Sequence, residues 1–214
     1  EKNITEQMTN AVESRAAIID DFVASAEEHM TAFSLSDEVR SVLIEPNNPQ
    51  LLEKAQRYTS DFANVKGIFE GLYIATPDTY VLTHTEKEAV GITTRQGDSL
   101  TTFKNTILNK RELTNLGVMV SPGTGNMVIS MYCPVFDGEK CIGYVGAAVY
   151  ADQLMNSILD LKLGNLPNSE YIFINAETGV YIYNKDSNLL NEKTTDKGHM
   201  EIVEVVRKNS KALT

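Results

Sequence analysis

The chain has 214 residues, 42% of them hydrophobic, so it is long enough and apolar enough to bury a substantial core. Its formal net charge is −10, from 29 acidic and 19 basic residues, with no run of Lys or Arg. These features argue against nucleic acid or an anionic membrane surface as a partner.

The first predicted element is a long helix over residues 1 to about 45, because apolar side chains recur there at steps of three or four. The apolar positions are Ile4, Met8, Val12, Ala16, Ile19, Val23, Ala26, Met30 and Phe33. A helix of about 40 residues would be roughly 60 Å long. Two interpretations stay open: a core helix with a frayed start, or a stalk that also pairs with a second copy of the chain.

A second helix is expected to start after the sequence EPNNPQ (45–50), because proline cannot continue the first one. Asn48 and Pro49 suit the N-cap and the first helical position. The apolar spacing carries this helix to about Val65.

From residue 69 the apolar period changes to two, which predicts strands. Strands are expected over 69–76 and 80–85, joined by a Pro-Asp-Thr turn, and a further strand near 117–121. A loop over 86–98 and a short helix over about 99–109 are expected between the second and third of these strands. Asp98 or Ser99 is expected to cap the helix.

A long hairpin is predicted from strands 127–136 and 140–150, because Asp-Gly at 137–138 is a strong hairpin-turn signal. The remaining expected elements are a helix over about 151–161, a hairpin within 170–184 and a helix over about 197–208. The tail therefore repeats the first half of the preceding unit. The predicted fold class is α+β, with helices packed on antiparallel sheet.

This order resembles the double Cache (dCache) family, extracellular sensor domains with PAS-like sheets behind a long N-terminal helix. The resemblance rests on GLYIATPDTYVLTHTEKEAVGITTR (71–95), VSPGTGNMVISMYCPVFDGEKCIGYVGAAVYADQL (120–154) and YIFINAETGVYIYNKD (171–186). With the helices, these segments cover nearly the whole chain. The sequences VLTHT (81–85) and VGITTRQGDSL (90–100) in particular resemble the Cache domains of methyl-accepting chemotaxis proteins.

The resemblance implies four segments: the N-terminal helices over 1–65, a membrane-distal sensing module over 66–150, a linker helix over 151–166, and an incomplete membrane-proximal module over 167–214. It implies a chemoreceptor ectodomain that binds a small molecule outside the cell and signals through the long helix. Transmembrane helices would flank this chain, and the N-terminal helix would form a homodimer. The alternative is a ligand-free or partner-sensing ectodomain of a histidine kinase or diguanylate cyclase.

Amino-acid-sensing members of the family have an Arg-x-Trp-Tyr motif on the short helix. They also have a Tyr and an Asp just after the following strand, and an Asp near the end of the last strand. Here the helix reads GDSLTTF, the loop SPGTGN has neither Tyr nor Asp, and Ala148 stands where a carboxylate is expected. An α-amino group needs an anionic partner. The expected ligand is therefore not an amino acid.

The long hairpin is expected to present a polar, small face and an apolar face, because strand side chains alternate. The face predicted to line the ligand site consists of Ser130, Tyr132, Tyr144, Gly146 and Ala148. The face predicted to pack on the long helix consists of Met131, Cys133, Val135, Cys141, Val145, Ala147 and Val149. Small residues would leave space and hydroxyls would orient a ligand; alternatively, Leu100 and Phe103 fill the gap.

Other candidate ligand contacts lie around this face. Arg95 is expected to bind a carboxylate with its planar guanidinium. Asp98 is either a ligand contact or the helix cap, and His84 either a ligand contact or a structural residue. Tyr73 and Ser121 complete the set.

The pairing expected in the long hairpin opposes Cys133 to Cys141. A cross-strand disulfide is then one interpretation, and two buried thiols are the other. The sequence has no CxxC, no Cys/His cluster, no P-loop and no Gly-x-Ser-x-Gly. No metal, cofactor or enzymatic activity is therefore expected.

Overall fold

The computed structural model describes residues 2–121, 123–151, 154–155 and 170–212. The chain divides into two compact units, Val12–Ile158 and a second that joins Glu1–Ala11 to Leu159–Thr214. Most of the helix predicted over 151–161, and the start of the predicted membrane-proximal module, lie outside the described residues.

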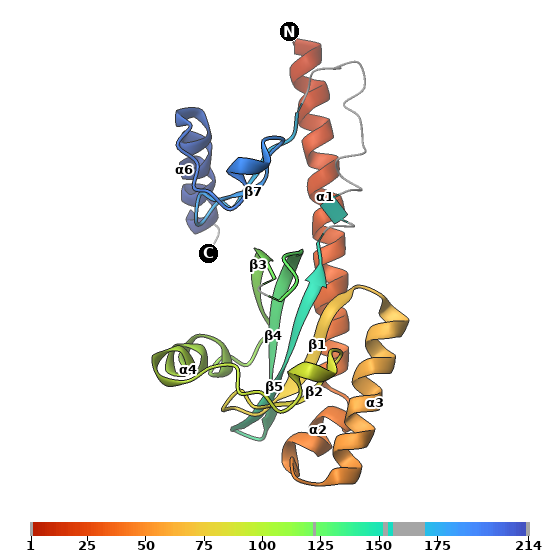
Figure 1. The fold of residues 1–214 in the computed structure, drawn as a ribbon. Helices are drawn as coiled ribbons and strands as arrows, with labels where there is room; N and C mark the ends of the chain where they lie inside the picture. The colour runs from red at the N-terminus through yellow and green to blue at the C-terminus, as the bar shows by residue number, and fades with distance from the viewer. Residues whose placement is uncertain (1, 122, 152–153, 156–169, 213–214) are drawn as a thin grey trace. The chain divides into compact units, whose positions relative to one another are not determined.

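The N-terminal helix is shorter than predicted. Helix α1 spans Lys2–Ser34, and a separate helix α2 spans Asp37–Ile44 (Figure 1). The chain breaks because the Ser36 side chain accepts a hydrogen bond from the Val39 N–H and so caps a new helix. Asp37 and Glu38 in the first turn of α2 favour that start, since anions stabilise a helix N-terminus.

Helix α3, Pro49–Lys66, begins as predicted. The Asn48 side chain accepts hydrogen bonds from the backbone N–H groups of Gln50 and Leu51. The helix ends at Gly67, whose φ of 66° is the left-handed conformation that glycine adopts without steric cost.

A five-stranded antiparallel sheet forms the centre of the larger unit, with strand order β2-β1-β5-β4-β3. Its strands are β1 Phe69–Ala75, β2 Val81–His84, β3 Thr114–Val120, β4 Met127–Asp137 and β5 Lys140–Tyr150. Between β2 and β3 the chain forms η1 (Lys87–Ala89), helix α4 (Gly97–Phe103) and a π-helical turn, η2 (Lys104–Leu108). In Figure 1, α1 and α3 lie on one side of this sheet and α4 on the other.

The sheet face toward α1 carries the main hydrophobic core. The buried residues that meet there include Ala26, Met30 and Phe33 from α1 and Met131, Cys133, Val135, Val145, Ala147 and Val149 from the long hairpin. The predicted packing of this face on the long helix is confirmed for all of its residues except Cys141.

The predicted register of the long hairpin is wrong. Ser130 pairs with Ala148 and Cys133 with Val145, whereas a bulge shifts the pairing so that Cys141 lies opposite Phe136. The turn contains two residues, and Gly138 adopts a φ of 58°. Because the error is an even number of positions, the remaining residues keep their predicted faces.

The two cysteines consequently lie on opposite sides of the sheet. Cys133 belongs to the core beneath α1, and its thiol donates to the Ser34 hydroxyl at 3.3 Å. Cys141 packs with the aromatic residues of the other face, because the bulge inverts the alternation of β5 near the turn. Both thiols are free, so the disulfide interpretation is corrected.

The described part of the smaller unit contains hairpin β6–β7, η3 and helix α6. Their bounds are Phe173–Ile174, Tyr181–Tyr183, Ser187–Leu189 and Lys197–Ala212. The isolated bridge between Val180 and Lys193 repeats the one between Tyr80 and Thr93. The predicted repeat of the first half of the larger unit is therefore present.

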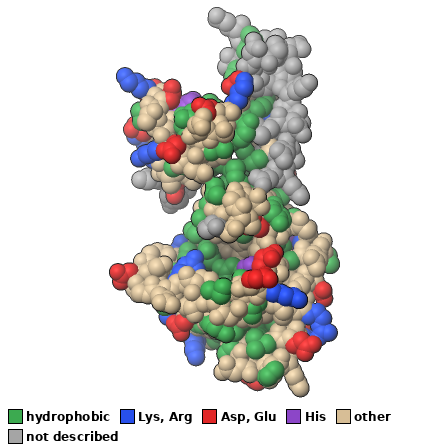
Figure 2. Space-filling model, viewed as in Figure 1, with side chains coloured by type: hydrophobic (Ala, Val, Ile, Leu, Met, Phe, Trp, Pro, Cys, Tyr) green, Lys and Arg blue, Asp and Glu red, His purple; other side chains and the backbone are tan. Residues whose placement is uncertain are grey.

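Charged side chains are mixed over the visible surface. Figure 2 shows Lys and Arg scattered among Asp and Glu on the face in view, without a continuous basic area. None of the described helices combines the length and the apolar character needed to span a bilayer.

Candidate functional site

One row of paired residues crosses all five strands on the face opposite α1. The row runs His84, Tyr73, Gly146, Tyr132 and Thr114, in the order of the strands. Directly paired residues share a sheet face. The fold thus brings together three of the predicted site residues, Tyr73, His84 and Tyr132.

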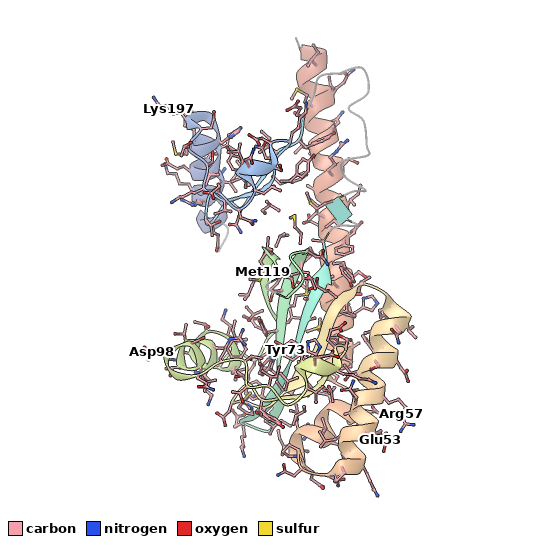
Figure 3. All side chains as sticks on the ribbon, viewed as in Figure 1. Glu53, Arg57, Tyr73, Asp98, Met119 and Lys197 are labelled. Carbon is pink, nitrogen blue, oxygen red and sulfur yellow. The ribbon has the colours of Figure 1, made fainter. Side chains whose placement is uncertain are left out.

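The Tyr73 ring fills the space above Gly146, which has no side chain of its own. A Cβ added to Gly146 would lie 2.3 Å from Tyr73 Cζ, so the tyrosine ring rests directly on the glycine backbone. Figure 3 shows Tyr73 over the middle of the sheet. The empty space expected above Gly146 is therefore occupied, by Tyr73 rather than by the expected Leu100.

Tyr73 belongs to an aromatic cluster with Tyr132, Tyr144 and Phe103. Its ring meets the Tyr144 ring edge-on at 5.9 Å, and Phe103 meets both Tyr132 and Tyr144 edge-on at 5.1 Å. Ile107 and Leu108 of the π-helical turn pack against the same cluster. The expectation that Phe103 fills part of this face is confirmed.

Arg95, one of the predicted ligand contacts, lies against this cluster. Its guanidinium stacks over the Phe103 ring, 4.1 Å from the centroid, and Nη2 donates to the Tyr132 hydroxyl at 3.0 Å. Nη1 donates to the Thr94 hydroxyl at 3.3 Å. In the part of the chain that is described, Arg95 forms no ion pair with an Asp or Glu side chain.

The hydroxyls of Tyr73 and Tyr144 stay protonated and can donate hydrogen bonds. Burial raises the pKa of Tyr144, and it raises that of Tyr73 well above the ordinary range. Tyr144 is fully buried. None of the described residues bonds its hydroxyl with normal hydrogen-bond geometry, although Tyr73 and Thr94 are its polar neighbours.

His84 closes the aromatic row at the sheet edge. Its ring stacks on Tyr73 at 5.3 Å, and Nδ1 accepts a hydrogen bond from the Glu86 N–H at 2.8 Å. The Gln56 side chain holds the His84 backbone on both sides, accepting from its N–H at 3.1 Å and donating to its carbonyl at 2.8 Å. Burial lowers the pKa of His84.

Two predicted residues form a floor of small side chains beside the aromatic row. Ser130 pairs with Ala148, and Ala148 pairs in turn with Gly71. Ser130 is buried and Ala148 half-buried. The ligand-binding role of both residues stays a prediction.

Asp98 and Ser121 lie apart from the aromatic cluster. Asp98 is exposed in the first turn of α4, on the side away from Tyr73 (Figure 3). Gln96 occupies the N-cap position of α4 and its side chain makes no capping hydrogen bond. The prediction that Asp98 or Ser99 caps this helix is therefore wrong. Ser121 is buried in the β3–β4 turn, where its backbone bonds to Asn126.

Thr79 and Thr94, which were not among the predicted site residues, lie next to Arg95. Thr94 is a neighbour of Tyr144, and Thr79 bonds the Arg95 backbone. Thr79 follows Asp78 in a turn where glycine is usual, which was the signal available in the sequence. Within the described residues, no group of three His, Cys, Asp or Glu side chains is arranged to hold a metal.

Comparison with known proteins identifies the fold. No family model and no curated protein sequence matches this chain. The sensor domain of the V. cholerae histidine kinase DctB is similar in structure, with a TM-score of 0.72 at 9% identity over 95% of this chain and 75% of that one.

Other solved sensor domains match as well. The sensory domain of the Campylobacter jejuni chemoreceptor Tlp3, with isoleucine bound, gives a TM-score of 0.64 at 12% identity over 96% of this chain and 80% of that one. A domain of a putative sensory box/GGDEF family protein from Vibrio parahaemolyticus gives 0.60 at 14% identity over 88% and 73%. The chain therefore has the α+β, PAS-like fold of Cache-type sensor domains, as the sequence resemblance implied.

Proposed function

We propose that this chain is the extracellular sensing domain of a bacterial transmembrane chemoreceptor, and that it binds a small carboxylate at Arg95 and the neighbouring tyrosines. The observation that carries the proposal is a half-buried guanidinium without a carboxylate partner among the described residues. Beside it lies the buried Tyr144 hydroxyl, for which the described residues offer no hydrogen bond of normal geometry. The shared fold with solved sensor domains supports it.

The chemistry of the site favours an anion. A guanidinium offers a planar set of five N–H donors, and among the described residues the Arg95 side chain donates to the hydroxyls of Thr94 and Tyr132. The protonated hydroxyls of Tyr73 and Tyr144 add O–H donors in a partly desolvated place, where hydrogen bonds to a charged group are strong. A carboxylate on the exposed side of Arg95 would accept from the guanidinium, and a small movement of the aromatic cluster would bring the buried tyrosine hydroxyls within its reach.

The same chemistry disfavours an α-amino acid. Tlp3 has been solved with isoleucine and valine bound. In this chain, Arg95 lies against the aromatic cluster and its hydroxyls, and no described Asp or Glu pairs with Arg95. An ammonium group placed there would lie beside a cation without an anionic partner.

The sheet offers a direct route from the site to the helix. Tyr132 faces the site, and its chain neighbours Met131 and Cys133 are buried in the core that contains α1. A small displacement of β4 by ligand would therefore change the packing against α1. The signal can be no larger than the ligand's preference for one packing over the other.

A second copy of the chain is the proposed partner of the N-terminal helix. Ile4, Met8 and Val12 are exposed on its first turns, by 48%, 47% and 61%. A parallel pairing of two such helices would cover these side chains. Sedimentation equilibrium should show a concentration-dependent dimer that Met8→Glu weakens.

A thermal-shift and calorimetry screen tests the ligand proposal. The probes are butyrate, benzoate and succinate, each beside its uncharged amide, together with 2-aminobutyrate. We expect at least one carboxylate to raise the melting temperature in proportion to the logarithm of its concentration, whereas its amide does not. Arg95→Met should reduce the affinity by about tenfold or more.

Arg57→Met is the matched control, because Arg57 is an exposed residue of α3 and the change removes the same charge (Figure 3). It should leave the affinity unchanged. Equal loss in both variants would show that only net charge matters and would contradict an Arg95 site. Failure of every carboxylate to stabilise the chain would favour the alternative of a ligand-free or partner-sensing ectodomain.

A further inference from the structure

Thr79 adopts a backbone conformation that its side chain disfavours. Its φ is 60°, in the left-handed region, and it is a β-branched residue that is fully buried. Such residues rarely occupy this region, because Cβ crowds the backbone. Thr79 ends the Thr76–Thr79 turn between β1 and β2, at a position where hairpins usually place glycine.

The Thr79 hydroxyl bonds both backbone groups of Arg95. It accepts from the Arg95 N–H at 2.9 Å and donates to the Arg95 carbonyl at 3.3 Å. The Thr79 carbonyl also accepts from the Thr94 N–H at 3.0 Å. The backbone that carries the guanidinium is thus fixed to the turn by three hydrogen bonds, two of which need the hydroxyl.

The smaller unit supplies an internal comparison without the hydroxyl. Its corresponding turn is one residue longer, because the Gly179 N–H donates to the Asn175 carbonyl. It places Gly179 at a φ of 74°, and the Gly179 carbonyl accepts from the Thr194 N–H at 2.8 Å. The residue that corresponds to Arg95 is Thr195. A turn at this place in the repeat can therefore contain glycine. The strained threonine is found in the larger unit, where the segment bonded to the turn carries Arg95.

We propose that Thr79 is the positioning residue of the ligand site, which fixes the Arg95 backbone so that the guanidinium is held over Phe103 and beside Tyr132. The proposal rests on the proposed carboxylate site. Glycine would relieve the strain at this position, and so the hydroxyl is the property that the position requires.

The test compares three variants with the wild-type chain. Thr79→Gly removes the hydroxyl and the strain, and it should fold because glycine adopts a φ of 60° without steric cost. Thr79→Ser keeps the hydroxyl. Thr76→Ala is the matched control, because it removes a different hydroxyl bond of the same turn, the one that Thr76 accepts from the Tyr80 N–H.

Two measurements are made on each variant: hydrogen–deuterium exchange of the Arg95 amide by NMR, and the affinity for the carboxylates butyrate, benzoate and succinate by calorimetry. Thr79→Gly should lose protection of the Arg95 amide and weaken binding by about tenfold. Thr79→Ser and Thr76→Ala should keep both properties close to wild type.

Binding by Thr79→Gly at wild-type affinity would overturn the proposal, as would equal losses in Thr79→Ser. If the wild-type chain binds none of the carboxylates, the proposed function fails. The exchange measurement then decides the inference separately, because an Arg95 amide equally protected in Thr79→Gly would show that Thr79 does not hold Arg95.

Discussion

Adding one methyl group at Gly146 perturbs the centre of the aromatic row. The Cβ of alanine would lie 2.3 Å from Tyr73 Cζ and 2.6 Å from Cε1, whereas ordinary contact begins at 3.4 Å. The ring must therefore move by about 1 Å. It is confined by His84 on one side and by Tyr144 on the other.

Two opposing effects determine the stability of Gly146→Ala. Overpacking of a buried site costs about 1–3 kcal/mol. The reduced freedom of the unfolded chain contributes about 0.4–1 kcal/mol in the opposite direction. The expected net loss is about 1–2 kcal/mol of unfolding free energy, accompanied by a changed near-ultraviolet tyrosine signal, since the chain has no tryptophan.

Urea unfolding followed by circular dichroism measures this loss. Gly123→Ala is the control, because the nearest atom to its added Cβ would be 4.0 Å away, and it should be close to neutral. In a Tyr73→Ala background, Gly146→Ala should cost almost nothing, since the clash is gone. A loss that persists in that background would refute the packing of Tyr73 on Gly146.

Three further predictions concern neighbouring residues. Burial lowers the pKa of His84, so the unfolded chain binds more protons than the folded chain, and stability should fall as the pH drops below about 6.5 through that lowered pKa. His84→Gln should flatten this dependence in urea unfolding between about pH 5 and 7.5. Parallel pH curves for the variant and the wild type would contradict the prediction. Gln56→Ala should cost roughly 1–3 kcal/mol in the same assay, because two bonds to the His84 backbone are lost, whereas Glu53→Ala on the exposed side of α3 should change stability by less than about 0.5 kcal/mol. Cys133 and Cys141 should both react with Ellman's reagent after unfolding without reductant. In the native chain both should react only slowly, because burial raises the pKa of both thiols. A single reacting thiol, or none, in the unfolded chain would contradict free cysteines.

The order of the elements could be predicted because local signals mark it. The cap at Asn48 with Pro49, the change of apolar period near residue 69 and the Asp-Gly turn at 137–138 act through neighbouring residues. The break at Ser36 carried a comparable signal, but the continuous apolar stripe obscured it.

The register of the long hairpin could not be predicted from the same signals. A bulge adds one residue to one strand of a pair, and in a strand rich in glycine and alanine it leaves no distinct sequence pattern. The predicted sheet faces of Tyr132 and Tyr144 are still correct, because a register error of an even number of residues does not change which face a side chain occupies. The predicted face of Cys141 is wrong, because Cys141 lies beyond the bulge.

The site was predictable in composition but not in packing. Arg95, Tyr73, Tyr132 and Tyr144 were identified as candidates, and the fold brings them together. That a tyrosine from β1 would cover Gly146 depends on a pairing between distant strands, which spacing along the chain does not reveal.

The most direct test of a carboxylate site at Arg95 is an NMR titration of the chain with its tyrosine rings labelled with ¹³C. A binding carboxylate should shift the ring signals of Tyr132 and Tyr144 saturably, with the same affinity as calorimetry gives, and leave Tyr183 of the smaller unit unchanged. Arg95→Met should abolish the shifts. Saturable binding that leaves Tyr132 and Tyr144 unshifted, or that persists unchanged in Arg95→Met, would contradict the site.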